Sequence, residues 1–169
     1  ILDHHIGRPP EKITVDGKEM TPLEFLKNVV KIDPDDYADM LSLMESPYWE
    51  NAEYVCPDNW WHSRRYNNLP LDRFMTVIKR SLQNGYTLTI GGDVSEPGYF
   101  SFKDVAMVPS FDIPSEYIDE NARQFRFTNG ATTDDHGIHV VGYKEIDGII
   151  WYLIKDSGSG ARNGRNSGY

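Results

Sequence analysis

The chain has 169 residues, of which 39% are hydrophobic and 12% aromatic, enough apolar material for a packed core and too much for wholesale disorder. Its formal net charge of −9 repels phosphates, so we expect neither nucleic acid nor an anionic membrane surface as a partner. No apolar run approaches the roughly 20 residues that span a bilayer, and the single cysteine, Cys56, excludes both an internal disulfide framework and a zinc site of several thiolates.

The first predicted helix covers about residues 21–31. Thr21 supplies a capping hydroxyl, Pro22 suits the first helical position, and Glu24 is placed to complete a capping box. One face of this helix is apolar and consists of Leu23, Phe25, Leu26, Val29 and Val30. Residues 33–68 show no sustained period and are rich in Pro, Asp, Asn and aromatic residues. We therefore expect a long ordered loop region there, of a kind that often has a functional role.

A second helix is predicted over residues 71–82, because apolar residues recur there at helical spacing and Asn84-Gly85 supplies a stop signal. Residues 86–90 then predict a short buried strand that ends at Gly91-Gly92. Residues 92–115 have the composition of a loop.

A further short helix is expected near residues 115–122, and the pattern then becomes that of a β-hairpin. Its two strands are predicted at residues 138–143 and 149–154, with Asp147-Gly148 as the turn signal. Residues 157–169 are loop by composition. Helices and antiparallel strands that occur in separate runs indicate the α+β class, not a doubly wound parallel sheet.

A histidine and a carboxylate stand at matching ends of this hairpin. His136 begins the first strand and Asp156 follows the second, so an antiparallel pairing brings those two ends side by side. A carboxylate beside an imidazole fixes the orientation and tautomer of the ring, which is the relation between base and orienting residue in a nucleophilic triad. The pattern therefore predicts a candidate catalytic site at this end of the hairpin.

The hairpin register decides which histidine meets the carboxylate. A tight two-residue turn pairs Ile146 with Ile149 and places Asp156 opposite His139, whereas a five-residue loop places Asp156 opposite His136. The two histidines are three positions apart and point to opposite faces of a strand, so only one of them can serve as the base. Turn chemistry alone favours His139.

The hairpin resembles the signature of papain-like cysteine peptidases. In that signature the catalytic histidine precedes alternating apolar residues and Gly-Tyr, and the second strand ends in Lys-Asn-Ser-Trp-Gly. Here His136-Gly137 precedes Val141-Gly142-Tyr143, and Lys155-Asp156-Ser157 stands at the second position. Further similarity to the bleomycin hydrolase/aminopeptidase C branch extends over roughly residues 55–169. It includes Asn59-Trp60, the helix over 71–82, Gly92-Asp93-Val94 and the run from Phe127 to Thr133.

This resemblance implies that residues 1–169 are the C-terminal part of one papain-like domain, with the hairpin in its β-rich barrel half and helices beside it. It favours His136 over His139 as the base and makes Asp156 the residue that orients it. The activity implied is that of a cysteine-type, aminopeptidase-like enzyme that needs no metal or organic cofactor. The resemblance also implies a cytoplasmic enzyme, while the sequence itself leaves the compartment open.

Two further residues are candidates for substrate contact. Asp135, like Asp134 and Glu96, supplies negative charge suited to the ammonium group of a peptide substrate. Trp60 belongs to the pair Trp60-Trp61, which suits the lining of a substrate groove. The alternative for the tryptophans is a small satellite core beneath the long loop.

The sequence departs from the family pattern in three places. Asp156 replaces the asparagine, which keeps an acceptor for the imidazole and adds negative charge, and Gly158-Ser159 stands where Trp-Gly is usual. The Gly-x-Cys-Trp motif of the nucleophile is absent from these residues, and Pro57 after Cys56 disfavours a helix that begins at that cysteine. We therefore expect the nucleophile in an upstream segment of the same protein, so that this chain alone is inactive.

Two other classes of function are alternatives to the peptidase. A non-catalytic papain-like module would bind a peptide or partner without cutting it, and the missing asparagine and tryptophan motivate that hypothesis. A metal-dependent hydrolase would use carboxylates and imidazoles from Asp134 to His139 as ligands, although the strand geometry separates the two histidines. A peptide is the expected substrate, and a homo-oligomer is a further possibility that the sequence leaves open.

Overall fold

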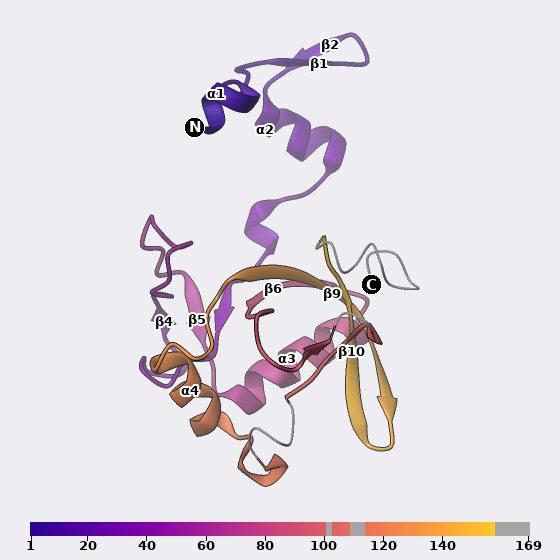
Figure 1. Cartoon of the computed structure of the whole chain (residues 1–169). Coiled ribbons are helices and arrows are strands. Elements are labelled where there is room, and N and C mark those ends of the chain that lie inside the picture. Colours follow the sequence, from indigo (N-terminus) through magenta and orange to yellow (C-terminus); the bar gives the residue numbers. More distant parts are fainter. Residues whose placement is uncertain (101–102, 109–113, 158–169) are drawn as a thin grey trace. The chain divides into compact units, whose positions relative to one another are not determined.

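A computed structural model describes residues 1–100, 103–108 and 114–157 of the chain (Figure 1). These residues form two compact units, one of residues Ile1–Asp39 and one that begins at Met40, and each is considered by itself. The expectation that both units belong to one domain stays a prediction. Within the described residues, none of the helices combines the length and apolarity that a membrane crossing requires.

The first unit contains a short helix, α1 (Leu2–Ile6), and a small hairpin of β1 (Ile13–Val15) and β2 (Lys18–Met20). Asp16 and Gly17 connect the two strands with φ angles of 50° and 75°. Two positive φ angles in a two-residue loop are the geometry whose twist matches that of paired strands.

The predicted helix over residues 21–31 is present in the first unit as α2 (Pro22–Phe25) followed by the π-helix η1 (Leu26–Val30). The expected capping box is also present. The Thr21 Oγ1 accepts a hydrogen bond from the Glu24 backbone N–H at 3.2 Å, and the Thr21 N–H donates to Glu24 Oε2 at 2.7 Å. Lys31, with a φ of 60°, ends the helix, and a 3-10 turn, η2 (Pro34–Asp36), follows.

The predicted loop region 33–68 contains a three-stranded sheet that the sequence did not reveal. Its strands are β3 (Met40–Leu41), β4 (Asn51–Ala52) and β5 (Tyr66–Asn68), in the order β3-β5-β4. Strand β3 runs parallel to β5, and β4 runs antiparallel to it. Strands of two or three residues are too short to produce a sequence period, which explains why the prediction missed them.

Two sets of contacts hold this small sheet. Leu41, Leu43 and Ala52 form a buried cluster against which Tyr54, Tyr66 and Phe127 pack. The fully buried Asn68 side chain makes the polar contacts, since its Oδ1 accepts a hydrogen bond from the Leu43 N–H at 2.9 Å. Its Nδ2 donates to the carbonyls of Leu43, Ser46 and Pro47. One amide thus satisfies the backbone of a chain reversal that has no ladder of its own.

Helix α3 (Leu71–Gln83) and strand β6 (Leu88–Gly92) follow as the sequence predicts, although β6 begins and ends later than expected. Gly91 and Gly92 continue the strand because they pair with Gly137 and His136. The predicted loop over 92–115 also contains a hairpin of β7 (Tyr99–Phe100) and β8 (Val105–Ala106). The helix expected near 115–122 lies later: a 3-10 turn, η4 (Ser115–Tyr117), precedes α4 (Glu120–Thr128).

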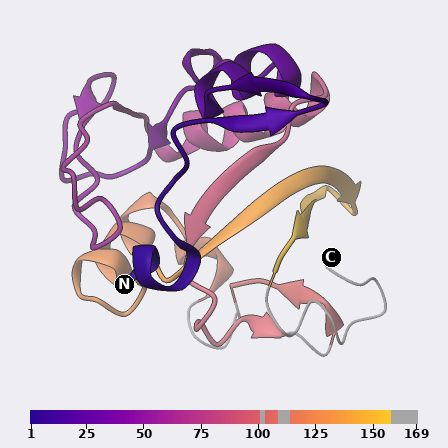
Figure 2. The same cartoon turned by 90° about the horizontal axis from the view of Figure 1, so that it is seen from above.

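The main sheet of the second unit has the order β10-β9-β6 and is antiparallel throughout. Strand β9 (His136–Ile146) pairs with β6 through its first half and with β10 (Ile149–Lys155) through its second, and it curves between them (Figure 1). Figure 2, turned by 90°, shows β6 and β9 side by side as well. Asp147 and Gly148 form the predicted turn, with φ angles of 52° and 78°.

Replacement of Asn68 by alanine should lower the free energy of unfolding by about 3 kcal/mol, because three carbonyls and one N–H lose the partner that the buried amide provides. Asn51→Ala is the matched control. The Asn51 side chain is exposed and makes one hydrogen bond, to the Arg65 carbonyl, so its loss should cost less than about 1 kcal/mol. Urea unfolding of both variants measures the difference, and equal costs would contradict the bracing role of Asn68.

Candidate active site

A β-bulge sets the register of the hairpin at the candidate site. The tight turn pairs Ile146 with Ile149, and the regular ladder continues to Gly142 and Leu153. Ile154 then pairs with Val140, so Val141 is an extra residue on β9, and Lys155 pairs with His139. A single inserted residue exchanges the two faces of the following strand. Asp156 therefore lies on the His136 face even though the turn is the two-residue one.

The structure brings the predicted base and orienting residue together. The His136 Nε2 and the Asp156 Oδ1 are 2.6 Å apart, a short charge-assisted contact. The Asp156 side chain is 7% exposed and the His136 side chain 25% exposed. His139 points to the other face of β9, where it is exposed. The partially open imidazole and the covered carboxylate give the pair one side that solvent or a reactant can reach.

Tyr99 on β7 contacts the second oxygen of the same carboxylate. Its hydroxyl donates a hydrogen bond to the Asp156 Oδ2 at 3.2 Å. Burial raises the pKa of Tyr99, and the hydrogen bond and negative charge of Asp156 raise it further. Sequence reasoning missed this residue, because Tyr99 lies 57 positions before Asp156 in a segment with loop composition. No local signal in the sequence connects the two.

An apolar cavity of about 530 Å³ lies next to Asp156. Side chains from α3, β6, β8, β9 and β10 line it, and Tyr99 and Asp156 lie on its wall. An apolar wall lowers the local dielectric constant and strengthens the attraction between a carboxylate and an imidazolium. The Asp156 carboxylate therefore lies in largely apolar surroundings.

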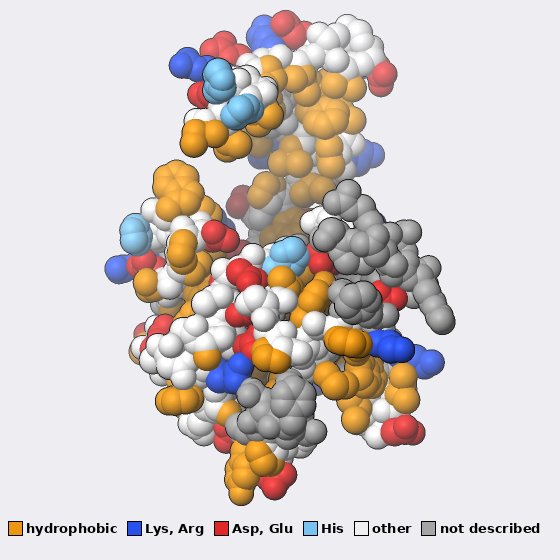
Figure 3. Space-filling model, in the orientation of Figure 1, with side chains coloured by type: hydrophobic (Ala, Val, Ile, Leu, Met, Phe, Trp, Pro, Cys, Tyr) orange, Lys and Arg blue, Asp and Glu red, His pale blue; other side chains and the backbone are white. Residues whose placement is uncertain are grey.

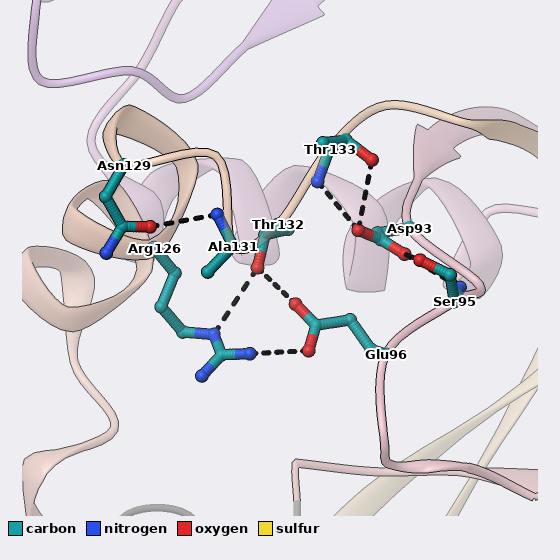
Figure 4. A network of polar contacts seen from close by, with 8 residues as sticks. All are labelled: Asp93, Ser95, Glu96, Arg126, Asn129, Ala131, Thr132 and Thr133. Atoms are coloured by element: carbon teal, nitrogen blue, oxygen red, sulfur yellow. Dashed lines mark hydrogen bonds and ion pairs between the residues drawn. The ribbon is translucent and has the colours of Figure 1, made fainter.

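A polar network ties the segment before His136 to the loop after β6 (Figure 4). The Asp93 carboxylate accepts hydrogen bonds from the backbone N–H groups of Thr133 and Ser95, each at 2.7 Å. These bonds lower the pKa of Asp93, chiefly through the Thr133 backbone. Arg126 forms an ion pair with Glu96 at 2.5 Å, and Thr132 donates to the same carboxylate. The network fixes the segment that leads into the strand that carries His136.

Asp134 lies against the backbone of β6 and next to an aromatic side chain. Burial raises the pKa of Asp134, and a hydrogen bond with Tyr54 opposes that shift. A Cβ built on Gly91 would meet the Asp134 Oδ1 at 2.9 Å, closer than a real Cβ contact allows. The glycine at position 91 therefore makes room for the carboxylate two positions before His136.

The residues predicted to contact substrate do not form one cluster in the structure, and each has its own partner. The Asp135 Oδ1 accepts a hydrogen bond from the Val94 N–H at 3.1 Å, and the Glu96 charge is neutralised by Arg126. Trp60 is 77% exposed and packs edge-on against Trp61, with ring centroids 5.6 Å apart. Within the described part of the chain, no hydrogen bond or ring contact joins Trp60 to His136.

The lone cysteine lies in a turn, not at the beginning of a helix. Its carbonyl accepts a hydrogen bond from the Asn59 N–H at 3.1 Å, and the buried Asn59 side chain braces the same loop through Tyr54 and Ser63. A thiol there gains no stabilisation from helix N–H groups. Gly158-Ser159, which stand where the family has Trp-Gly, lie outside the described residues.

The predicted alternative of a metal cluster between Asp134 and His139 does not correspond to a set of converging ligands. Asp134 contacts Tyr54, Asp135 contacts Val94, and His136 contacts Asp156. Across residues 1–100, 103–108 and 114–157, no three His, Cys, Asp or Glu side chains lie together so as to hold a metal ion.

The fold and site define an α+β protein with a histidine–carboxylate pair at the end of an antiparallel hairpin, as the sequence predicted for the fold class. Its fold is similar to part of the crystal structure of PepW from Lactobacillus rhamnosis HN001, with a TM-score of 0.62 and 21% sequence identity. The similarity covers 92% of this chain and 39% of the PepW chain, so the chain spans about two fifths of that protein. Comparison with family models and with curated proteins gives no match.

Substitution of Gly91 by alanine should displace the Asp134 carboxylate and lower the free energy of unfolding by about 1–2 kcal/mol. Gly92→Ala is the matched control, because a Cβ built on Gly92 meets nothing within 4 Å. Urea unfolding measures both costs, and a titration of Tyr54, whose pKa is raised by burial and by the Asp134 charge, reports the displacement. A Gly91→Ala cost no larger than that of Gly92→Ala would refute the close packing inferred here.

Proposed function

We propose that this chain carries the base of a cysteine-type peptidase, with His136 as that base and Asp156 as the residue that orients it. The observation that carries the proposal is the 2.6 Å contact between His136 Nε2 and Asp156 Oδ1 on a histidine that is one quarter exposed. The resemblance of the hairpin to the papain-like signature and the fold shared with part of PepW support it.

The contact assigns separate roles to the two ring nitrogens of His136. An ionised Asp156 can only accept a hydrogen bond, so the Nε2 of a neutral His136 carries the proton and donates the hydrogen bond to Asp156. The Nδ1 of the same ring then keeps its lone pair. In the proposed reaction Nδ1 takes the proton of a cysteine thiol, and the thiolate attacks the peptide carbonyl to form an acyl-thioester. The imidazolium then protonates the leaving amine, and water hydrolyses the thioester.

The nucleophile is proposed to lie in a segment of the protein outside these 169 residues. Cys56 lies in a turn, and the sequence contains no motif that would present a second thiol. The chain also corresponds to only 39% of the PepW chain. Large apolar side chains remain exposed on the β9–β10 hairpin and suit packing against further protein (Figure 3). They are Tyr143, Ile146, Ile149 and Leu153.

The finer proposal is aminopeptidase-like cleavage, in which acidic groups hold the substrate's ammonium group. Asp134 and Asp135 directly precede His136 in the chain and are the candidates for that contact. Trp60 is a second proposed substrate contact, because exposed aromatic side chains on a braced loop are preorganised to bind. Glu96 is a weaker candidate than the two aspartates, since Arg126 already neutralises its charge.

The first test replaces the histidines in the full-length protein. His136→Ala should lower kcat/KM for peptide hydrolysis by about 10³-fold or more, because the thiol loses its base. Asp156→Asn should retain activity within about 10-fold, since an amide oxygen still orients the ring. His139→Ala, on the opposite face of β9, is the matched control and should stay within about 2-fold of the parent. Full activity in His136→Ala would refute His136 as the base, whereas no activity in the unaltered protein would favour the non-catalytic binding module.

The second test locates the nucleophile. Cys56→Ser should leave peptidase activity within about 2-fold of the parent, because the reactive thiolate is expected elsewhere. Iodoacetamide should inactivate the full-length protein and its Cys56→Ser variant at similar rates, and mass spectrometry identifies the alkylated cysteine. Loss of activity in Cys56→Ser, together with labelling of Cys56 in the parent, would place the nucleophile inside this chain after all.

A further inference from the structure

The Asp156 carboxylate is held from two sides by residues of different strands. Its Oδ1 contacts His136 at the beginning of β9, and its Oδ2 accepts the hydrogen bond of the Tyr99 hydroxyl from β7. The distances are 2.6 Å and 3.2 Å. Tyr99 thus reaches the imidazole through one intervening carboxylate, without itself touching the ring or the position of a reactant.

A hydrogen bond to its second oxygen stabilises a carboxylate in this position. Asp156 is 7% exposed and lies on the wall of an apolar cavity, where an oxygen without a hydrogen bond would cost free energy. A carboxylate held through only one oxygen could also rotate about its Cβ–Cγ bond and leave the imidazole. Donation from Tyr99 to the second oxygen both satisfies that oxygen and restrains the rotation.

The identity of residue 156 decides whether the Tyr99 hydroxyl donates or accepts the hydrogen bond between them. An asparagine there would present Oδ1 to the imidazole and an NH₂ group to Tyr99, so the phenol would have to accept a hydrogen bond. An aspartate presents two acceptors, so the same phenol must donate. A hydrogen bond to an ionised acceptor is also roughly twice as strong as a neutral one. The arrangement is therefore matched to aspartate.

We propose that Tyr99 is a positioning residue that holds the Asp156 carboxylate in place and, through it, fixes the His136 ring for proton transfer. This inference rests on the proposed function of the His136–Asp156 pair. Tyr152 lies on the wall of the same cavity and offers a matched comparison, because its pKa is raised by burial alone whereas Tyr99 also feels Asp156.

The first experiment uses the 169-residue chain and requires no activity. Tyrosine labelled with ¹³C at Cζ is titrated by NMR in the parent and in Asp156→Asn. Removal of the negative charge should lower the pKa of Tyr99 and leave that of Tyr152 unchanged. The Nε2 proton of His136 should be sharp in the parent and in Tyr152→Phe, and broadened by exchange with water in Tyr99→Phe. An unchanged Tyr99 pKa, or a His136 signal indifferent to Tyr99→Phe, would overturn the proposal.

The second experiment measures kcat and KM of the full-length protein. Tyr99→Phe should lower kcat by about 5- to 10-fold with little change in KM, whereas Tyr152→Phe should leave both within about 2-fold. In the Asp156→Asn background Tyr99→Phe should change kcat by less than about 2-fold, because the charged acceptor is gone. Equal effects of Tyr99→Phe in both backgrounds would show a merely structural role.

The two experiments separate the failure of this inference from the failure of the proposed function. A full-length protein without peptidase activity would refute the function, and with it any role of Tyr99 in that reaction. If the protein is active, His136→Ala is inactive, and Tyr99→Phe has the same kcat and KM as Tyr152→Phe, only the role of Tyr99 is refuted. Thermal unfolding of each variant distinguishes a local effect from loss of the fold.

Discussion

The position of one extra residue in the β9–β10 ladder determines which histidine can meet the carboxylate. Without Val141 as a bulge, the two-residue turn would place Asp156 opposite His139, on a face where that histidine is exposed. With the bulge, the face of β10 beyond Leu153 is exchanged, and Asp156 reaches His136 instead. The tight turn and the His136 contact, which are incompatible in a regular ladder, are both present for this reason.

The two members of the pair differ in exposure and surroundings. His136 begins β9 and is partly exposed, while Asp156 is buried, lies on the wall of an apolar pocket and is bonded to Tyr99. Such an arrangement lets the carboxylate act strongly on one ring nitrogen and leaves the other nitrogen to face a reactant. The segment that precedes β9 is also held in place. The Asp93 carboxylate accepts a hydrogen bond from the Thr133 N–H, and Gly91 leaves room for the Asp134 side chain. The polar ties and the apolar wall thus serve the same purpose, which is to define the position of a single imidazole.

Elements with local signals were predictable, and elements without them were not. The capping box at Thr21, the helix of Leu71–Gln83 and the Asp147-Gly148 turn follow from residues a few positions apart, and the structure contains all three. The short strands within residues 33–68 and the β7–β8 hairpin depend on partners far along the chain, such as the Asn68 amide that bonds Leu43. Strand β6 runs on through Gly91-Gly92 because β9 pairs with it, which overrides the stop signal of two glycines.

The sequence by itself determined the α+β class, the hairpin, and the short set of side chains from which a base and its orienting carboxylate could be chosen. Tertiary structure decided which histidine meets Asp156, because a bulge has no sequence signature and yet changes the face on which a side chain lies. Tertiary structure alone also brought Tyr99 to Asp156 across 57 positions and placed the carboxylate on the wall of an apolar pocket. Local propensity acts over a few residues, whereas the contacts that orient this imidazole join segments that only folding places together.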